Sequence, residues 1–158
     1  MEDGLDEKLR EFEGRQDHNW QRLIFHLRKH LDIWAHMNVE PSWIKMKLSY
    51  FPVLCNIDVD GNTPSEISEK SMITKQNVSR TLKELAEHGM VKTIVNKDDK
   101  RSDIIVLTES GKQTVYEANI NIFKLHETYK TFVGAKDLET TIATINKILA
   151  FHKTQSQK

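Results

Sequence analysis

The residues of this chain that could do chemistry are concentrated in one basic stretch near its middle. Residues 70–101 hold eight Lys or Arg residues and four acidic residues, although the whole 158-residue chain has 23 of each kind and no formal net charge. Because salt screens charges beyond about 8–10 Å, a local basic patch can bind phosphates even on a neutral protein. The stretch therefore predicts phosphate contacts, with a solvated face of scattered lysines as the simpler alternative.

Within this stretch, residues 75–88 predict a helix whose outer face is polar and basic. Asn and Gln can bond the edge of adenine and Arg the edge of guanine, and the N-terminal end of a helix favours phosphates. Acidic residues come only in the second half, at Glu84 and Glu87. This charge order favours a DNA-reading helix over an ordinary amphipathic one. The candidate DNA contacts of the region are Ser65, Thr74, Lys75, Gln76, Asn77, Ser79, Arg80 and Lys83.

Two helix starts close together must position these residues. The run Thr63-Pro64-Ser65-Glu66 has the pattern of a capping box with proline at the first helical position, which predicts a helix over about residues 64–70. Thr74 is the expected cap of the helix over 75–88, and Gly89 is its expected end. Since only three residues separate the two helices, they must meet at a steep angle, which is the helix-turn-helix arrangement.

A β-hairpin is predicted directly after the helix-turn-helix. Residues 91–96 and 103–107 have the composition of strands, and the connection between them is wholly polar. A hairpin in this position is the wing of a winged helix. Arg101 at its tip could enter a narrow minor groove, with Asp99 orienting the guanidinium. The alternative is a polar hairpin tip without a partner.

Longer helices are predicted on both sides of this region. Apolar spacings of three and four predict one helix over residues 5–37, which Gly14 could divide into two. A second follows Thr108, its expected cap, and runs to about residue 132. Gly134 separates it from a last helix that ends near residue 152.

The segment between the first helix and the helix-turn-helix is less regular. Pro41 marks a loop over residues 38–48, and Ser49 is the expected cap of a short buried helix. That helix contains Phe51, Val53, Leu54 and Ile57 and ends at the turn cluster of residues 58–62.

Residues 48–111 resemble the multiple-antibiotic-resistance regulator (MarR) family of winged-helix transcription factors. The resemblance is carried by four runs: Leu48 to Leu54, Thr63-Pro64-Ser65-Glu66-Ile67-Ser68, Val78-Ser79-Arg80-Thr81-Leu82-Lys83-Glu84-Leu85 with Gly89-Met90-Val91, and Asp99-Lys100-Arg101-Ser102 with Val106-Leu107-Thr108-Glu109-Ser110-Gly111. Two features depart from the family pattern. Lys100 stands where family members frequently have a second Arg. The segment that leads to the second helix, residues 38–48, is longer than in the family pattern.

The resemblance implies a mainly α fold with a small β-hairpin wing, which forms a winged helix-turn-helix over residues 48–108. It also implies that residues 1–37 and 109–158 form a helical dimerisation region. Each recognition helix of the homodimer would enter one half of a pseudo-palindrome, with half-sites about 10 base pairs apart. Family members usually repress nearby genes and release DNA when a small effector binds. Relatives bind aromatic effectors near the positions of Trp34, Trp43 and Met46, for which core packing or a dimer contact is the simpler alternative.

Other candidate sites have simpler explanations. Cys55 follows an apolar run, and buried cysteines are inert, so a small hydrophobe is a simpler interpretation than a redox sensor. His26 and His30 share a helix face but lack further ligands, and we expect no metal site. Asp58-x-Asp60-x-Asn62 mimics part of a calcium loop, without the glycine that such a loop needs at its sixth position.

Several classes of function are not expected. No apolar run approaches the roughly 20 residues of a membrane span, and residues 2–17, with seven acids and three bases, do not resemble a signal peptide. A single cysteine predicts a reducing, cytoplasmic location. We find no catalytic constellation and expect neither an enzyme nor a cofactor. The remaining alternative is a winged-helix module that binds protein rather than DNA.

Overall fold

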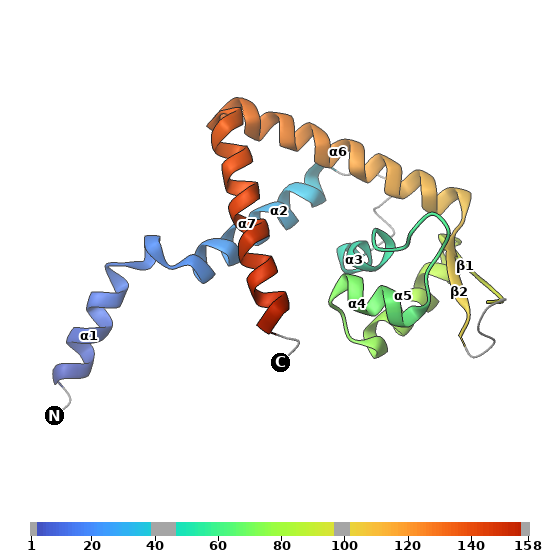
Figure 1. The fold of residues 1–158 in the computed structure, drawn as a ribbon, viewed down its shortest axis with the longest axis horizontal. Helices are drawn as coiled ribbons and strands as arrows, with labels where there is room; N and C mark the ends of the chain where they lie inside the picture. Colours follow the sequence, from blue (N-terminus) through green and yellow to red (C-terminus); the bar gives the residue numbers. More distant parts are fainter. Residues whose placement is uncertain (1–2, 39–46, 97–101, 156–158) are drawn as a thin grey trace. The chain divides into compact units, whose positions relative to one another are not determined.

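The computed structural model describes residues 3–38, 47–96 and 102–155 (Figure 1). It divides into two compact units, residues 1–51 and 52–158, and each is described by itself. The elements of the first are α1 (Asp3–Glu13), the 3-10 helix η1 (Gln16–His18), α2 (Trp20–Asn38) and the 3-10 helix η3 (Leu48–Tyr50). The elements of the second begin in α3 (Phe51–Leu54) and continue as α4 (Pro64–Ser71), α5 (Lys75–Glu87), β1 (Val91–Ile94), β2 (Ile104–Leu107), α6 (Glu109–Val133) and α7 (Ala135–Gln155).

The first helical segment is divided in two, as Gly14 allowed. α1 ends at Glu13, one residue before the glycine, and α2 begins only at Trp20. Asn19 caps the new helix, because its side-chain Oδ1 accepts a hydrogen bond of 3.0 Å from the backbone N–H of Arg22. The prediction of one continuous helix over residues 5–37 was therefore wrong, and the division was the correct alternative.

The prediction that Ser49 caps a helix was also wrong. Ser49 lies inside η3, and the residue with extended backbone before that helix is Lys47, at φ −70° and ψ 137°. A capping residue needs such a non-helical backbone, so Ser49 cannot act as one. α3 is only four residues long, and Ile57 is buried in the turn that follows it rather than in the helix.

α4 and α5 form the helix-turn-helix that the sequence predicts. The capping box of α4 is complete, because Thr63 Oγ1 accepts from the Glu66 N–H while the Glu66 carboxylate accepts from the Thr63 N–H at 2.7 Å. α4 packs against α5 across the turn. The fully buried side chains of this region are Val53, Leu54, Ile67, Val78 and Leu85.

The hairpin is antiparallel and shorter than predicted. Val91 pairs with Leu107 and Ile94 with Ile104, so each strand has four residues. β1 follows α5 closely and packs on it, and β2 leads into α6.

A third backbone segment pairs with the hairpin, and sequence reasoning missed this segment. Asn62 forms an isolated antiparallel bridge with Ile105, through hydrogen bonds of 3.0 and 2.8 Å. Gly61 precedes it at φ +89°, where a Cβ would lie 2.6 Å from the Cγ2 of Ile104 and from the Cγ1 of Val106. The turn before α4 is thus fastened to β2, and only glycine fits there.

The two C-terminal helices follow the prediction with small changes of length. Thr108 caps α6 by accepting from the Gly111 N–H at 3.0 Å, and Gly134, at φ +89°, ends it. α7 runs three residues beyond the predicted end at residue 152. α6 packs against α7, but large apolar side chains on both helices stay exposed.

Candidate nucleic-acid interface

α5 is positioned by one buried apolar face and by hydrogen bonds that cap both of its ends. Its buried residues are Val78, Thr81, Leu82 and Leu85. At its start, Thr74 Oγ1 accepts from the Asn77 N–H at 3.4 Å, and the first turn carries no acidic residue. The positive end of the helix dipole is therefore open to an anion.

The other face of α5 carries the predicted contacts. Lys75, Gln76, Asn77, Ser79, Arg80 and Lys83 are all exposed. With 3.6 residues per turn, five of them fall within less than half of the helix circumference, and Asn77 lies at the margin of the buried face. The structure thus brings the predicted major-groove residues to one surface. This surface carries the guanidinium group predicted to bond guanine and the amide groups predicted to bond adenine.

The C-terminal end of α5 is fixed by a Schellman motif. Gly89, at φ +68°, donates its N–H to the Ala86 carbonyl, and Met90 donates to the Leu85 carbonyl, both at 2.9 Å. The chain then enters β1 at Val91. Because this turn is fixed, the recognition helix and the first wing strand keep one relative orientation.

The turn between α4 and α5 contains a residue that sequence reasoning missed. Met72 has φ 56° and ψ 30°, the left-handed conformation that a non-glycine residue rarely adopts, and its side chain is 92% exposed. Ser68 supports the turn by donating from its hydroxyl to the Ile73 carbonyl at 2.6 Å. Ser65 and Thr74, the other two candidate contacts, are exposed on either side of this turn.

Lys70, one of the eight bases of the central stretch, has a partner within the fold. Its ammonium forms an ion pair with Asp58, which also accepts from the Asn62 side chain at 3.0 Å. The hydrogen bond from Lys70, followed by that from Asn62, lowers the pKa of the Asp58 carboxyl. The hydrogen bonds from the backbone and then the side chain of Thr63 lower the pKa of Glu66 in the same way. These residues stabilise the approach to α4 and are not part of the exposed face of α5.

The wing is described at its strands but not at its tip. Asp99 and Arg101 lie outside the described residues, so their pairing and their reach into a minor groove remain predictions. On β1, Lys92 is exposed and lies close enough to Glu109 to help lower the pKa of that carboxyl, although the side chain of Lys112 is the main cause.

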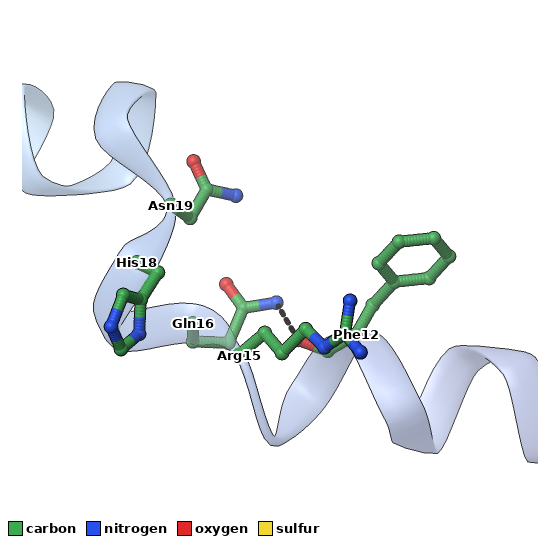
Figure 2. Close-up of a pocket in the computed structure, with 5 residues that line it drawn as sticks. All are labelled: Phe12, Arg15, Gln16, His18 and Asn19. Carbon is green, nitrogen blue, oxygen red and sulfur yellow. Dashed lines mark hydrogen bonds between the residues drawn. The ribbon is translucent and has the colours of Figure 1, made fainter.

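One of the three predicted effector residues lies within the described residues, and their grouping remains a prediction. Trp34 is half-buried in α2, and Trp43 and Met46 lie outside the described residues. A pocket of about 380 Å³ occurs elsewhere in the N-terminal unit, at the turn between α1 and α2. Figure 2 shows its lining residues, Phe12, Arg15, Gln16, His18 and Asn19, with Gln16 donating to the Phe12 carbonyl at 3.1 Å.

The remaining candidate sites have no binding geometry in the described residues. Burial raises the pKa of the Cys55 thiol to about 12, so the reactive thiolate is scarce at neutral pH. His26 and His30 are exposed on α2, and no group of three His, Cys, Asp or Glu residues in the described ranges could hold a metal ion. In those ranges no helix is both long and apolar enough to cross a membrane.

Two helices joined by a tight turn and followed by a two-stranded hairpin define a winged helix-turn-helix. Comparison with known proteins identifies its kind. Residues 45–102 match the MarR family model. An uncharacterized HTH-type transcriptional regulator of Staphylococcus aureus is 27% identical over 114 residues, which span 69% of this chain and 78% of the relative. Residues 45–102 are therefore similar to a MarR-family winged helix, and the chain is similar to HTH-type transcriptional regulators.

Solved structures share the fold over most of the chain. A mutant MarR from E. coli complexed with operator DNA has a TM-score of 0.71 at 22% identity, and the match covers 85% of this chain and 97% of that one. The PcaV transcriptional regulator from Streptomyces coelicolor, in complex with its natural ligand, also has a TM-score of 0.71, at 12% identity over 85% of this chain and 94% of that one. The predicted fold class is confirmed by these matches.

Proposed function

We propose that this protein is a sequence-specific DNA-binding repressor that acts as a homodimer on a pseudo-palindromic operator. The observation that carries the proposal is the outer face of α5, where Lys75, Gln76, Ser79, Arg80 and Lys83 are exposed together above a buried apolar face. Such a surface combines cations for phosphates with amide and guanidinium groups for base edges. The operator complex of MarR supports this use of the fold.

The homodimer is proposed from the terminal helices. α2, α6 and α7 carry exposed large apolar side chains, among them Leu23, Leu27, Phe123, Phe132 and Leu149. Apolar faces of this extent are usually covered in solution. In this proposal residues 1–37 and 109–158 form the dimerisation region and residues 48–108 bind DNA, with Asp99 and Arg101 placing the wing in the minor groove. A cytoplasmic location is part of the proposal, and no catalytic activity or cofactor is expected.

A small-molecule effector is proposed to release the DNA. The structure of PcaV in complex with its natural ligand, which has a similar fold, supports the presence of a ligand site. Here the proposed site includes Trp34, Trp43 and Met46, two of them outside the described residues. Quenching of tryptophan fluorescence by an aromatic ligand, reduced but not abolished in Trp34→Phe because Trp43 remains, is the expected result.

The decisive experiment is selection of bound sequences from a random duplex pool by the purified protein at moderate salt. Recovery of a two-fold palindrome with half-sites about 10 base pairs apart is the expected outcome. A double variant, Lys75→Ala with Arg80→Ala, should recover nothing while remaining folded, because both side chains are exposed. Enrichment that is equal for the wild type and the double variant would contradict the assignment of α5.

The alternative is a winged helix that binds another protein. The two functions differ in their response to salt. A protein that neutralises several phosphates loses DNA affinity log-linearly as salt rises, with a slope of about 0.9 per phosphate. No enrichment from the pool, combined with no salt-dependent retention on duplex DNA, would favour the protein-binding module.

A further inference from the structure

The start of α6 is fastened to the end of the recognition helix by hydrogen bonds that converge on Met90. Met90 lies directly before β1, and its carbonyl oxygen accepts from the Thr108 N–H at 3.0 Å. The Thr108 hydroxyl donates to the Gly89 carbonyl at 2.6 Å, with the Met90 carbonyl as a second acceptor at 3.2 Å. The hydroxyls of Ser110 and Thr114 both donate to the Met90 sulfur at 3.7 Å. Met90 therefore holds the first two turns of α6.

The same corner leaves no room for a side chain at Gly111, in the first turn of α6. Gly111 is buried, and a Cβ on it would lie 2.0 Å from the Met90 carbonyl oxygen and 3.0 Å from the carbonyl carbon. Gly111 is not among the glycines with a positive φ, so its conformational freedom does not explain why glycine stands there. The close approach of two backbones does explain it.

Capping of α6 alone does not require these contacts. A cap needs only the hydroxyl of Thr108 and the N–H of residue 111, which any residue except proline supplies, and this bond measures 3.0 Å. The bonds to the carbonyls of residues 89 and 90 reach instead to the turn that fixes the C-terminal end of α5. Because the backbone of α6 rests directly on the backbone of that turn, no flexible side chain separates them. α5 and α6 therefore keep one relative orientation.

The position of α6 at this corner determines where a dimer would place its recognition helices. α6 runs from the corner for 25 residues and belongs to the proposed dimerisation region (Figure 1). Moving a Cβ at residue 111 from 2.0 Å to an ordinary carbon–oxygen contact of about 3.4 Å requires a shift of about 1.4 Å. Two-fold symmetry doubles the shift, so the spacing of the two recognition helices could change by roughly 3 Å, close to the rise of one base pair.

We propose that Gly111 is the positioning residue that sets the spacing of the two recognition helices on the operator, because it lets α6 rest directly on Met90. This inference rests on the proposed homodimer and its palindromic operator. Gly111 touches no DNA in this proposal and acts only through the orientation of α5. It lies outside residues 45–102, which match the family model.

The test compares two DNA duplexes that differ only in one half-site. The first contains the palindrome recovered by the selection, and in the second one half-site is replaced by an unrelated sequence. Gly111→Ala in the full chain should lower the affinity for the palindrome at least tenfold and leave the affinity for the single half-site within twofold, because α5 itself is unchanged. Fluorescence anisotropy at fixed salt measures both affinities. Lys112→Ala, at the next and exposed position of α6, is the matched control and should leave both within twofold.

Two results for Gly111→Ala would overturn the proposal. Equal losses on the two duplexes would mean that the substitution damages α5 rather than misplaces it, and no loss on either duplex would mean that the close contact sets nothing. The wild type keeps this failure apart from that of the proposed function. A wild type that binds the palindrome no better than the single half-site would refute the dimeric function itself, whereas a wild type that prefers the palindrome leaves only the role of Gly111 at stake.

A second variant tests the same corner without adding a clash, and it decides the question if Gly111→Ala does not fold. Thr108→Val removes the hydroxyl bonds to residues 89 and 90 and so loosens α6 on the turn. The wild type should discriminate against palindromes whose half-site spacing is changed by one base pair, and Thr108→Val should reduce this discrimination at least threefold. Thr108→Ser keeps the hydroxyl and should restore it. Unchanged discrimination in Thr108→Val would overturn the proposal.

Discussion

At the residue scale, the strongest claim concerns Arg80. Its side chain is exposed on the outer face of α5, so its removal should not disturb the fold. Arg80→Ala is expected to weaken binding to the selected operator by about 1–3 kcal/mol, and to relax the base preference if the guanidinium bonds a base edge. Fluorescence anisotropy at fixed salt measures the affinity. Glu87→Ala, at the far end of the helix, is the control, and equal losses in the two variants would contradict a specific role.

Met72 is the second residue whose role can be tested. An L-residue in the left-handed conformation costs about 1–2 kcal/mol, and Asn tolerates that conformation better than Met. Met72→Asn should therefore raise the free energy of unfolding by up to about 1 kcal/mol, because the exposed side chain loses little packing. Met72→Ala lacks the short polar side chain that lets Asn tolerate this conformation by bonding locally to the backbone, so it should give no gain. Urea denaturation of the two variants distinguishes them, and a stabilised alanine variant would show that strain is not the cause.

At the element scale, the bridge between residue 62 and β2 depends on Gly61. A Cβ there would lie 2.7 Å from the Ile105 carbonyl oxygen and closer still to two side chains, at a φ of +89°. Gly61→Ala should cost roughly 3 kcal/mol, the sum of left-handed strain and overpacking. Gly89→Ala is the matched control, because Gly89 has φ +68° but open space around it. Gly89→Ala should lose only the stability that left-handed strain costs. If thermal unfolding shows equal losses of stability for Gly89→Ala and Gly61→Ala, the steric clash at residue 61 is not the cause.

The segment from Asp58 to the start of α4 should also make the folding stability depend on pH. Hydrogen bonds lower the pKa of Asp58 and of Glu66 from ordinary values of 3.8 and 4.5. A lowered pKa means that the folded state holds the charged form more tightly than the unfolded chain does. The resulting stability is present above these ordinary values and is lost as the pH falls below them. Glu66→Gln keeps the capping geometry without the charge, so its melting temperature should fall less steeply than that of the wild type between pH 5 and pH 3.

Local signals predicted these elements well, and long-range contacts were missed. The capping box, the Thr74 and Thr108 caps and the glycine-ended helices depend on neighbours within a few residues, so sequence alone was sufficient. The bridge of Asn62 to β2 joins residues far apart in the chain, and no local pattern indicates it. Ser49 failed as a cap because Lys47 takes the extended backbone that capping needs. The outer face of α5 was predicted from charge order, whereas Met72 was missed because its left-handed backbone has no signature in its residue type.

At the scale of the whole molecule, large apolar side chains are exposed on several of the described helices. The exposed side chains include Phe123 and Phe132 on α6, Leu149 on α7, and Leu5, Leu9 and Phe12 on α1. If these faces meet in a dimer, mass action makes the melting temperature rise with protein concentration. A hundredfold increase in concentration adds about 2.7 kcal/mol per dimer, which is roughly 4 °C for two chains of this size. Phe132→Glu should reduce this dependence, because it places a charge on one of these apolar faces. A wild-type melting temperature that does not change with concentration, checked by scanning calorimetry, would leave the recognition helices without the two-fold arrangement that a palindromic operator requires.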